Sequence, residues 1–510
     1  MTREHTRMRR GAGRPTEPTA QTRTGRWWWV PPALLLGIVG WRAAAHPLLV
    51  GDSHGLVIGS RHVVDCLRHG QFTWCDRRPD GLIGGPSPTG FRQGAVGQFA
   101  LLQYLLAVPL RAVGLGEMPT LRVLILIDFG ALLVALALVW RLARRLGPGL
   151  AAWGPVLALA LIVSPLLWYS TVPSAEVLAV ALMLGVVAGV IEDWPPVVLG
   201  LLVALACVSK ETNPLFVVAL GGLAFLARPA AERTRERLPR AAGPVLIGTL
   251  VGSLSNVAFN VFRYDSVNNL TYPRPPYGPP GLSFESRTFA ALLVSPNGGI
   301  LWFWPAAVGV LTIAACAWPR PRRADGWRSL VPWAVLAVFA AEEAGLALWY
   351  SPFGWIGWGP RLTLPVVPPL LVLAVAFAGT RGAGLLGRLL RGRGIWLAGV
   401  ALSVAGLTQL AFLDPQHVLR RFFRIGVSCA HRPIEVDPPA YYRCVQHLAW
   451  RRRPVLLEGL REVATPLGLV AALAVVGTVA GLLAVARREA EPQEEPVDGP
   501  TLARHGVQRP

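Results

Sequence analysis

Residues 51–70, GDSHGLVIGSRHVVDCLRHG, carry two acidic residues, three histidines and two arginines directly after the first long apolar run of the chain. That run, residues 27–45, has the length and composition of a segment that crosses a bilayer. The polar stretch therefore begins at a membrane boundary, and its pattern predicts an exposed helix. Nearly all of the remaining chain is apolar. We interpret it as a scaffold that holds this stretch, and a few other polar groups, over one face of a membrane.

The composition identifies the class of protein. The 510 residues are 53% hydrophobic and 15% charged, with a mean hydropathy of +0.45. Soluble domains carry about 25% charged residues, so many apolar runs in a chain of this composition predict a polytopic membrane protein. The net charge of +20 comes from arginines that flank apolar runs, as in the cytoplasmic loops of membrane proteins. The sequence has no basic soluble module, and we predict no nucleic-acid partner.

The arginines also predict the topology. Residues 1–26 and 487–510 are predicted to be disordered cytoplasmic tails on either side of a transmembrane domain, residues 27–486. The apolar run 95–115 contains Gln98, Gln103, Pro109 and Arg111. Placing it in the interface, rather than across the membrane, keeps the later basic loops inside.

The prediction is an all-α polytopic fold with about twelve transmembrane helices and with interfacial helices in a long first external loop, residues 46–119. A second external loop spans residues 414–465, and both termini are cytoplasmic. The predicted spans are residues 27–45, 121–140, 150–168, 175–190, 197–208, 214–226, 245–261, 300–317, 330–348, 362–377, 395–412 and 467–486.

The six cysteines divide into two kinds. Cys207 and Cys316 lie inside apolar runs and are expected to act as small hydrophobic residues. The other four lie in pairs in the two external loops, where an oxidising compartment favours disulfides. We predict the bonds Cys66–Cys75 and Cys429–Cys444.

Two carboxylates are candidates for catalysis, because this topology places them at one membrane face. Asp52, at the end of the first span, could act as a general base or could cap the helix that follows it. Glu176, in the turn YSTVPSAE, could position an acceptor or bind a metal with Asp52, or could be an ordinary acid near a helix start. Other candidates at the same face are His54, Tyr169, Tyr264, Arg274 and Trp358.

Two cations are candidates for binding a phosphate. Lys210, in the turn VSKETNP, is the only lysine among 49 basic residues; it could bind a phosphate as a point charge or extend to the membrane interface. Arg361 lies in an aromatic, glycine-rich turn, where it could bind a phosphate with two N–H groups or stack on a tryptophan.

Other ionisable groups have simpler interpretations. Glu342 and Glu343 lie within the ninth span and could relay protons, but acids in such places more often face an internal cavity or a nearby arginine. Asp128, in the second span, has the same interpretation. His62 and His69, with Asp65, share one face of the predicted helix, which favours a solvated surface over a metal site.

Taken in order, these stretches resemble the GT-C class of integral-membrane glycosyltransferases, in particular bacterial members similar to protein mannosyltransferases and aminoarabinose transferases. The stretch GDSHGLVIGSRHVVDCLRHGQF resembles the first external loop of the class and its acid, here Asp52. PLRAVGLGEMPTLRVLIL resembles the juxtamembrane helix followed by an arginine, here Arg122. The stretches YSTVPSAEVLAVAL, LACVSKETNPLFVV and GWIGWGPRLTLPVVPPL resemble turns that carry Glu176, Lys210 and Arg361.

The resemblance covers residues 27–412 and implies a function. Such enzymes transfer a sugar, here expected with inversion, from a polyprenyl-phosphate donor to a lipid, glycan or protein acceptor at the outer face of the cytoplasmic membrane. Asp52 and Glu176 would be catalytic, and Lys210, Arg361 and Arg122 would bind the donor phosphate. Mg²⁺ or Mn²⁺ is a candidate cofactor at Asp52 and Glu176, although Ser53 stands where most members have a second acid.

Two rival functions stay open at this stage. A transporter or flippase of a lipid-linked sugar would use acids at mid-membrane depth, such as Glu342 and Glu343. A catalytically inactive GT-C relative would act as a scaffold, and the single acid at the start of the first external loop is compatible with it.

Overall fold

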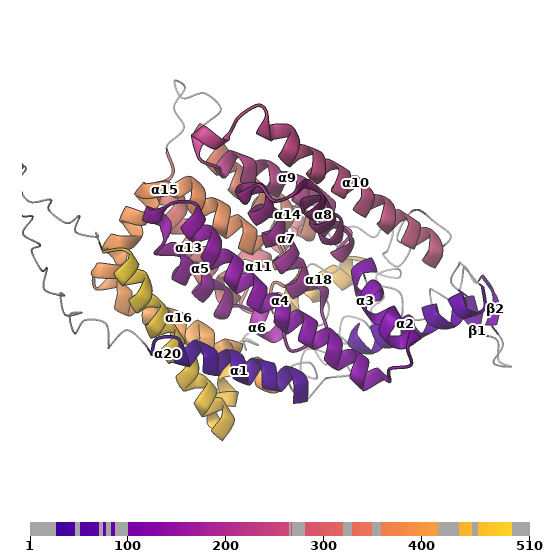
Figure 1. Ribbon diagram of the computed structural model, residues 1–510. Coiled ribbons are helices and arrows are strands. Elements are labelled where there is room, and N and C mark those ends of the chain that lie inside the picture. Colours follow the sequence, from indigo (N-terminus) through magenta and orange to yellow (C-terminus); the bar gives the residue numbers. More distant parts are fainter. Residues whose placement is uncertain are drawn as a thin grey trace, which may run out of the picture.

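The computed structural model describes residues 27–45, 52–70, 75–77, 83–86, 100–264, 267, 281–319, 329–348, 359–415, 417, 438–450 and 457–491. In these ranges the regular secondary structure is helical except for one antiparallel pair of strands, β1 (Cys75–Arg77) and β2 (Ile83–Pro86), which the sequence did not predict. The helices form one elongated bundle (Figure 1). The prediction of an all-α polytopic membrane protein is confirmed. The predicted tails, residues 1–26 and most of 487–510, lie outside the described residues.

Each of the twelve predicted spans coincides with a helix or with a broken helix. These helices are α1 (Val30–Ala45), α4 (Glu117–Arg145), α5 (Trp153–Ile162), α6 (Leu166–Tyr169), α7 (Ala175–Glu192), α8 (Pro196–Ser209), α9 (Asn213–Ala227), α10 (Arg237–Tyr264), α12 (Ile300–Phe303), α13 (Pro305–Ala317), α14 (Val331–Ala347), α15 (Val367–Arg391), α16 (Gly394–Thr408) with the 3₁₀ helix η8 (Gln409–Leu413), and α20 (Pro466–Glu489). Short 3₁₀ helices at the ends of these elements are η4 (Pro148–Leu150), η5 (Ala230–Glu232) and η7 (Arg361–Thr363).

Proline explains the two breaks. Pro165 separates α5 from α6, and Pro305 begins α13 directly after α12, because proline has no backbone N–H to continue a helix. The Ser164 hydroxyl accepts a hydrogen bond from the Leu166 N–H at 3.1 Å. The Trp304 indole donates to the Ala160 carbonyl at 2.7 Å. The second break is thus tied to α5.

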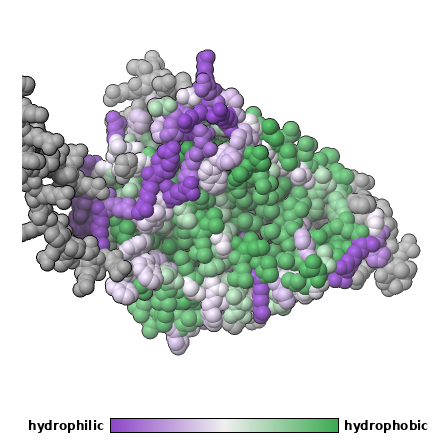
Figure 2. Space-filling model, in the orientation of Figure 1, coloured by the Kyte–Doolittle hydropathy of each residue, from purple (hydrophilic) through white to green (hydrophobic). Residues whose placement is uncertain are grey.

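The outer surface of the bundle suits a bilayer. Within the described ranges, six helices are long and apolar enough to cross a membrane. Large apolar side chains are exposed on several of them, including Leu250 of α10, Trp396 of α16 and Leu473 of α20. Figure 2 shows a broad hydrophobic surface, with hydrophilic residues gathered mainly at the upper left and in a smaller patch at the lower right. The chain is a multi-pass membrane protein.

The two helices of the predicted first external loop form a unit at one end of the bundle. α2 (Asp52–Arg68) packs against α3 (Leu101–Ala112), and both contact the first half of α4. Their shared core, which includes Leu56, Val63, Tyr104 and Ala107, is separate from the main core. α3 has 12 residues, about 18 Å at 1.5 Å per residue. That it lies in the interface stays a prediction.

Small residues let α8 and α10 approach closely. Gly248 and Gly252 lie one turn apart on α10. A Cβ atom at Gly252 would lie 2.5 Å from the Cys207 Cβ, and one at Gly248 would lie 2.8 Å from the Val203 Cβ. Because lipid is as apolar as a leucine side chain, such close packing is what holds membrane helices together.

The structure corrects the sequence analysis in two segments. α11 (Leu282–Val294) lies in the segment 263–296, and α18 (Pro438–Ala449), α19 (Leu457–Arg461) and the 3₁₀ helix η9 (Glu462–Ala464) lie in the segment 414–465. Both segments lie between predicted spans, and the sequence predicted no helix in them, because their prolines and charges mask short amphipathic helices. In addition, α15 continues past the end of the predicted span 362–377 as far as Arg391. It bends at Gly379, whose φ of 54° is one that glycine adopts without strain.

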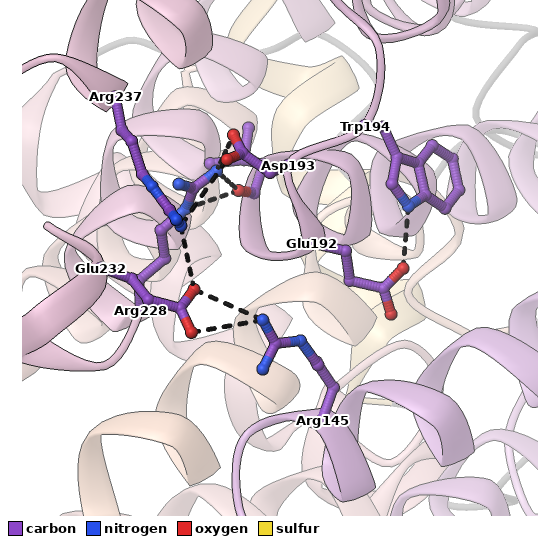
Figure 3. A network of polar contacts seen from close by, with 8 residues as sticks. Arg145, Glu192, Asp193, Trp194, Arg228, Glu232 and Arg237 are labelled. Carbon is purple, nitrogen blue, oxygen red and sulfur yellow. Dashed lines mark hydrogen bonds and ion pairs between the residues drawn. The ribbon is translucent and has the colours of Figure 1, made fainter.

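An ion-pair network joins the ends of α4, α7 and α10 that the arginine distribution predicts to face the cytoplasm. Arg228, which is fully buried, donates to the Val190 carbonyl and pairs with Asp193 at 3.0 Å. Asp193 ends α7 with a φ of 63°. Figure 3 shows the network, which also includes Arg145, Glu192, Trp194, Glu232 and Arg237. These contacts fix the end of the bundle that lies away from α2 and α3.

Candidate functional site

The candidate site is built around an ion pair between two turns that are far apart in sequence. The Arg361 Nε donates to the Glu176 Oε1 at 2.6 Å. The side chains of Arg361 and Glu176 are 19% and 8% exposed, so the pair is largely removed from solvent. Glu176 lies in the first turn of α7, and Arg361 begins η7. The structure therefore brings together two residues that the sequence analysis had selected independently.

Glycine and an aromatic ring shape the Arg361 turn. Gly359 has a φ of 69°, and a Cβ there would lie 2.6 Å from a ring atom of Phe303, so no larger residue fits. The Thr363 hydroxyl donates to the Pro360 carbonyl at 2.8 Å. The Arg361 guanidinium lies 6.0 Å from the centre of the Tyr169 ring, within the range of a cation–π contact. Tyr169, a predicted candidate, thus lies beside the Glu176–Arg361 pair.

Lys210 reaches the same turn from the end of α8. Its Nζ donates to the Leu362 carbonyl at 2.7 Å, and Leu362 is the residue after Arg361. The ammonium lies within electrostatic range of the Glu176 and Glu342 carboxylates and of the Arg361 guanidinium. The only lysine of the chain and the Arg361 guanidinium are therefore held close together, which sequence order alone could not show.

The two acids of α14 lie beside this pair of cations. Glu342 and Glu343 are 5% and 0% exposed. The Glu342 Oε2, both carboxylate oxygens of Glu343 and the Glu176 Oε2 are buried without a hydrogen-bond partner. Unsatisfied buried carboxylates are rare in proteins and indicate a place where a proton, a cation or a ligand binds. The sequence analysis favoured an internal cavity or an arginine near these acids; the structure places Glu342 near Lys210.

A further buried acid, Asp128 of α4, lies within electrostatic range of Glu176. Its Oδ2 accepts a hydrogen bond from the Ser174 backbone N–H at 2.9 Å, at the start of α7. Asp128 and Ser174 also line a small cavity whose remaining walls are mostly leucine side chains of α2, α3, α4 and α7, with Gln103. The sequence analysis gave Asp128 no role in the site. The signal that would have found it is an acid at membrane depth opposite the start of a neighbouring helix.

The other predicted site residues either do not contact the Glu176–Arg361 pair or lie outside the described part of the chain. Arg122 is exposed on the second turn of α4. Asp52 and His54 lie in the first turn of α2, and Tyr264 ends α10, but their side chains lie outside the described part of the chain, as do Arg274 and Trp358 altogether. Cys66 and Cys444 are disulfide-bonded, whereas Cys207 and Cys316 are free thiols. The pairings Cys66–Cys75 and Cys429–Cys444 stay predictions.

The described residues offer no obvious metal site. No three His, Cys, Asp or Glu side chains come together in the ranges that the structure describes. Glu176, which we had considered as a ligand beside Asp52, is instead paired with Arg361. On α2, Asp65 is buried and pairs with Arg61 at 3.2 Å, so the prediction of a solvated face does not hold for this residue.

A further polar cluster ties the end of α1 to the segment 414–465. The His417 Nε2 lies 3.0 Å from the Glu458 Oε2, and the Arg461 guanidinium lies 3.3 Å from the same oxygen. Burial and the neighbouring Asp414 carboxylate raise the pKa of Glu462, and His417, Arg461 and Arg42 of α1 oppose that shift.

Comparisons with known proteins complete the description. No family model and no curated protein matches the sequence. Among solved structures, the chain is similar to ArnT from Cupriavidus metallidurans bound to undecaprenyl phosphate, with 18% identity over 92% of this chain and 78% of that chain, and a TM-score of 0.43. For the apo state of that protein the identity is 17% over 89% and 77%, with a TM-score of 0.45. ArnT is a GT-C aminoarabinose transferase, a member of the class that the sequence motifs resemble.

Proposed function

We propose that this protein is a membrane glycosyltransferase that moves a sugar from a polyprenyl-phosphate donor to an acceptor hydroxyl at the outer face of the cytoplasmic membrane. The observation that carries the proposal is the convergence of Arg361, Lys210 and Glu176 from three separate turns at the same site. Two cations held close together within an apolar helical bundle suit a ligand with a phosphate group and a long hydrocarbon chain.

The contacts of the two cations suggest how each side chain acts. Arginine carries five N–H donors in a rigid plane, and the contact from Nε to Glu176 sets the orientation of that plane. The Lys210 ammonium is oriented by the carbonyl of Leu362. Because Glu176 is already paired with a cation, we propose that it positions Arg361 and does not take the proton of the acceptor.

The proton acceptor in this proposal is Asp52. Its carboxylate takes the proton of the acceptor hydroxyl, and the acceptor oxygen forms a bond to the anomeric carbon of the sugar. The bond between that carbon and the phosphate oxygen breaks, and polyprenyl phosphate leaves with the bonding electrons. Lys210 and Arg361 stabilise the negative charge that develops on the phosphate. We assign no step to a metal ion, because Arg361 occupies one of the two carboxylates proposed as ligands.

Sugar transfer tests the assignment of Asp52. Membranes that contain the wild-type protein, Asp52→Asn or Asp65→Asn are supplied with a panel of radiolabelled polyprenyl-phosphate sugars. Asp65 is the matched control because it lies on the same helix and pairs with Arg61. We expect transfer by the wild type and by Asp65→Asn, and none by Asp52→Asn. Transfer by Asp52→Asn at the wild-type rate would contradict the role of Asp52.

Donor binding tests the two cations separately from the chemistry. Undecaprenyl phosphate is the probe, and its affinity is measured for the wild type, Arg361→Gln, Lys210→Gln and Arg393→Gln. Arg393 is the control, since it is exposed in the arginine-rich segment 381–393 that is predicted to be cytoplasmic. We expect each of the first two variants to weaken binding by about tenfold or more, because hydrogen bonds between charged groups contribute about 1.5–3 kcal/mol. Equal affinities in all four proteins would refute a phosphate site at Arg361 and Lys210.

One observation favours a second candidate function. The buried, unpartnered carboxylates of Glu342 and Glu343 are what a proton-coupled flippase of a lipid-linked sugar would use. Such a protein would move the labelled lipid across proteoliposome membranes without transferring its sugar. Transport that survives Asp52→Asn and is lost in Glu343→Gln would favour the flippase. Transport that is absent from the wild type would exclude it.

A further inference from the structure

We propose that the cleft between α11 and α18 binds an anionic saccharide, a sugar chain that carries phosphate or carboxylate groups, and that this saccharide is the acceptor. The proposal rests on the proposed function and names the class of its acceptor. The cleft is lined by Arg287 and Ala290 of α11 and by Arg443, Gln446, His447 and Trp450 at and beyond the end of α18.

The lining residues share one face on each of the two helices. Arg443, Gln446, His447 and Trp450 are spaced by three, four and seven residues, so they share one face of α18 and its continuation. Arg287 and Ala290 are likewise on one face of α11. The cleft between these faces has a volume of about 480 Å³, which is within the range of about 300–1,000 Å³ for sites that bind small molecules.

The two helices are held together by hydrogen bonds that do not use the charged groups. The Gln446 Nε2 donates to the Phe284 carbonyl at 2.9 Å and to the Thr288 hydroxyl at 3.0 Å. The Asn297 side chain donates to the Leu448 carbonyl at 3.0 Å. Cys444 is disulfide-bonded, which adds a covalent tether to α18. The packing of the two helices that form the cleft therefore does not depend on Arg287 or Arg443.

The positively charged side chains of the cleft favour binding of an anion. Its lining carries two arginines and a histidine and no carboxylate. Within the described ranges, neither Arg287 nor Arg443 has an ion-pair partner. Like charges that face each other across a cleft repel, and a bound anion removes that repulsion.

The arginine content of the surrounding loop supports the same conclusion. Residues 414–465 contain nine arginines and five acidic residues, although the predicted topology places this loop outside, where arginine is disfavoured. External loops of membrane proteins are usually poor in arginine. Binding of an anion would explain why this segment is rich in it.

The tryptophan points to a sugar. Trp450 is 49% exposed at the mouth of the cleft. An indole ring offers a flat apolar face beside a polar N–H group, which suits the apolar face of a sugar ring while the arginines bind its charged groups. The acceptor of a glycosyltransferase must carry hydroxyl groups. α11 also packs against α14, the helix that carries Glu342, so the cleft is one helix away from the proposed donor site.

The test is a binding measurement on the full-length protein in nanodiscs of neutral lipid, without a sugar donor. The probes are maltotetraose phosphate, unmodified maltotetraose and inorganic phosphate. The variants are Arg287→Gln/Arg443→Gln, Trp450→Leu and the control Arg393→Gln. We expect the wild type and the control to bind maltotetraose phosphate at least about tenfold more tightly than either of the other probes. Arg287→Gln/Arg443→Gln should lose at least about tenfold in affinity for it, and Trp450→Leu should lose several-fold.

Each contrary outcome overturns the proposal in a different way. Equal affinity of the double-arginine variant and the wild type would mean that the cleft is not the site. If inorganic phosphate bound as tightly as maltotetraose phosphate, the cleft would be a site for simple anions and not for a saccharide. If phosphatidylglycerol in the nanodisc displaces the saccharide, the occupant is a lipid headgroup.

A separate measurement distinguishes this inference from the proposed function. Undecaprenyl phosphate binding should be unchanged in Arg287→Gln/Arg443→Gln, which also shows that the variant is folded. If that variant does not fold, the single variant Arg287→Gln replaces it, and an affinity equal to that of the wild type would contradict the proposal. Suppose that Arg361→Gln loses undecaprenyl phosphate binding and that the wild type does not bind the saccharide. The proposed donor site would then be supported, and only the proposed saccharide site would be wrong.

Discussion

The ion pair between Glu176 and Arg361 can be measured by a double-mutant cycle. The two side chains are joined at 2.6 Å and are 8% and 19% exposed. Removing one charge from such a pair leaves the other buried and unpaired, which destabilises a protein by about 3–5 kcal/mol. We therefore expect Arg361→Gln to lower the free energy of unfolding by about 3 kcal/mol or more. The double variant Glu176→Gln/Arg361→Gln should lose less than the sum of the single variants by about 1–3 kcal/mol, because two neutral amides can still form a hydrogen bond.

The assay is reversible unfolding in mixed micelles, followed by tryptophan fluorescence. A second cycle on Arg141 and Glu192 is the control, because these residues form a two-point contact at 2.7 and 2.6 Å at the other end of the bundle. The Arg141 side chain is 62% exposed, so its coupling energy should be no more than about 1 kcal/mol. If the Glu176 and Arg361 variants are additive within about 0.5 kcal/mol, the two charges do not form a desolvated pair, and the positioning role of Glu176 is wrong.

Three further predictions concern stability and are measured by the same unfolding assay. Asp128→Leu should destabilise the protein by about 1–3 kcal/mol, because it leaves the buried Ser174 N–H at the start of α7 unpaired. Asp128→Asn keeps an oxygen acceptor and should lose less stability. Equal losses in the two variants would contradict the contact between Asp128 and Ser174. Gly252→Leu should destabilise by about 1–3 kcal/mol or more through overpacking against α8, whereas Gly222→Leu has open space around it and should not. Burial and a neighbouring carboxylate raise the pKa of Glu462. The folded protein therefore holds this proton more tightly than the unfolded chain, and its contribution to stability is lost as the pH rises above about 4. Glu462→Gln should flatten the profile there, and an unchanged profile would contradict the assignment.

The sequence by itself determined the class of the molecule and the positions of its helices. Apolar runs near the thickness of a bilayer have few structural solutions, because every backbone polar group in lipid must be paired within the chain. The predicted spans therefore coincide with helices even where proline breaks them. The sequence also singled out Lys210, because it is the only lysine of a chain rich in arginine, and Arg361, because of its aromatic and glycine-rich turn. The helices in the segments 263–296 and 414–465 were missed, because short amphipathic helices give weak signals beside prolines.

Only the tertiary structure decided which polar residues meet. Glu176 and Arg361 are 185 residues apart, and nothing in the local pattern of either turn specifies the other as its partner. The packing of α7, α8 and η7 places them together and adds the Leu362 carbonyl as the anchor of Lys210. The same holds for Asp128 and Ser174, and for the cleft between α11 and α18. Local sequence fixes the helix and the face on which a side chain lies, whereas the contact between two faces depends on how the whole bundle packs.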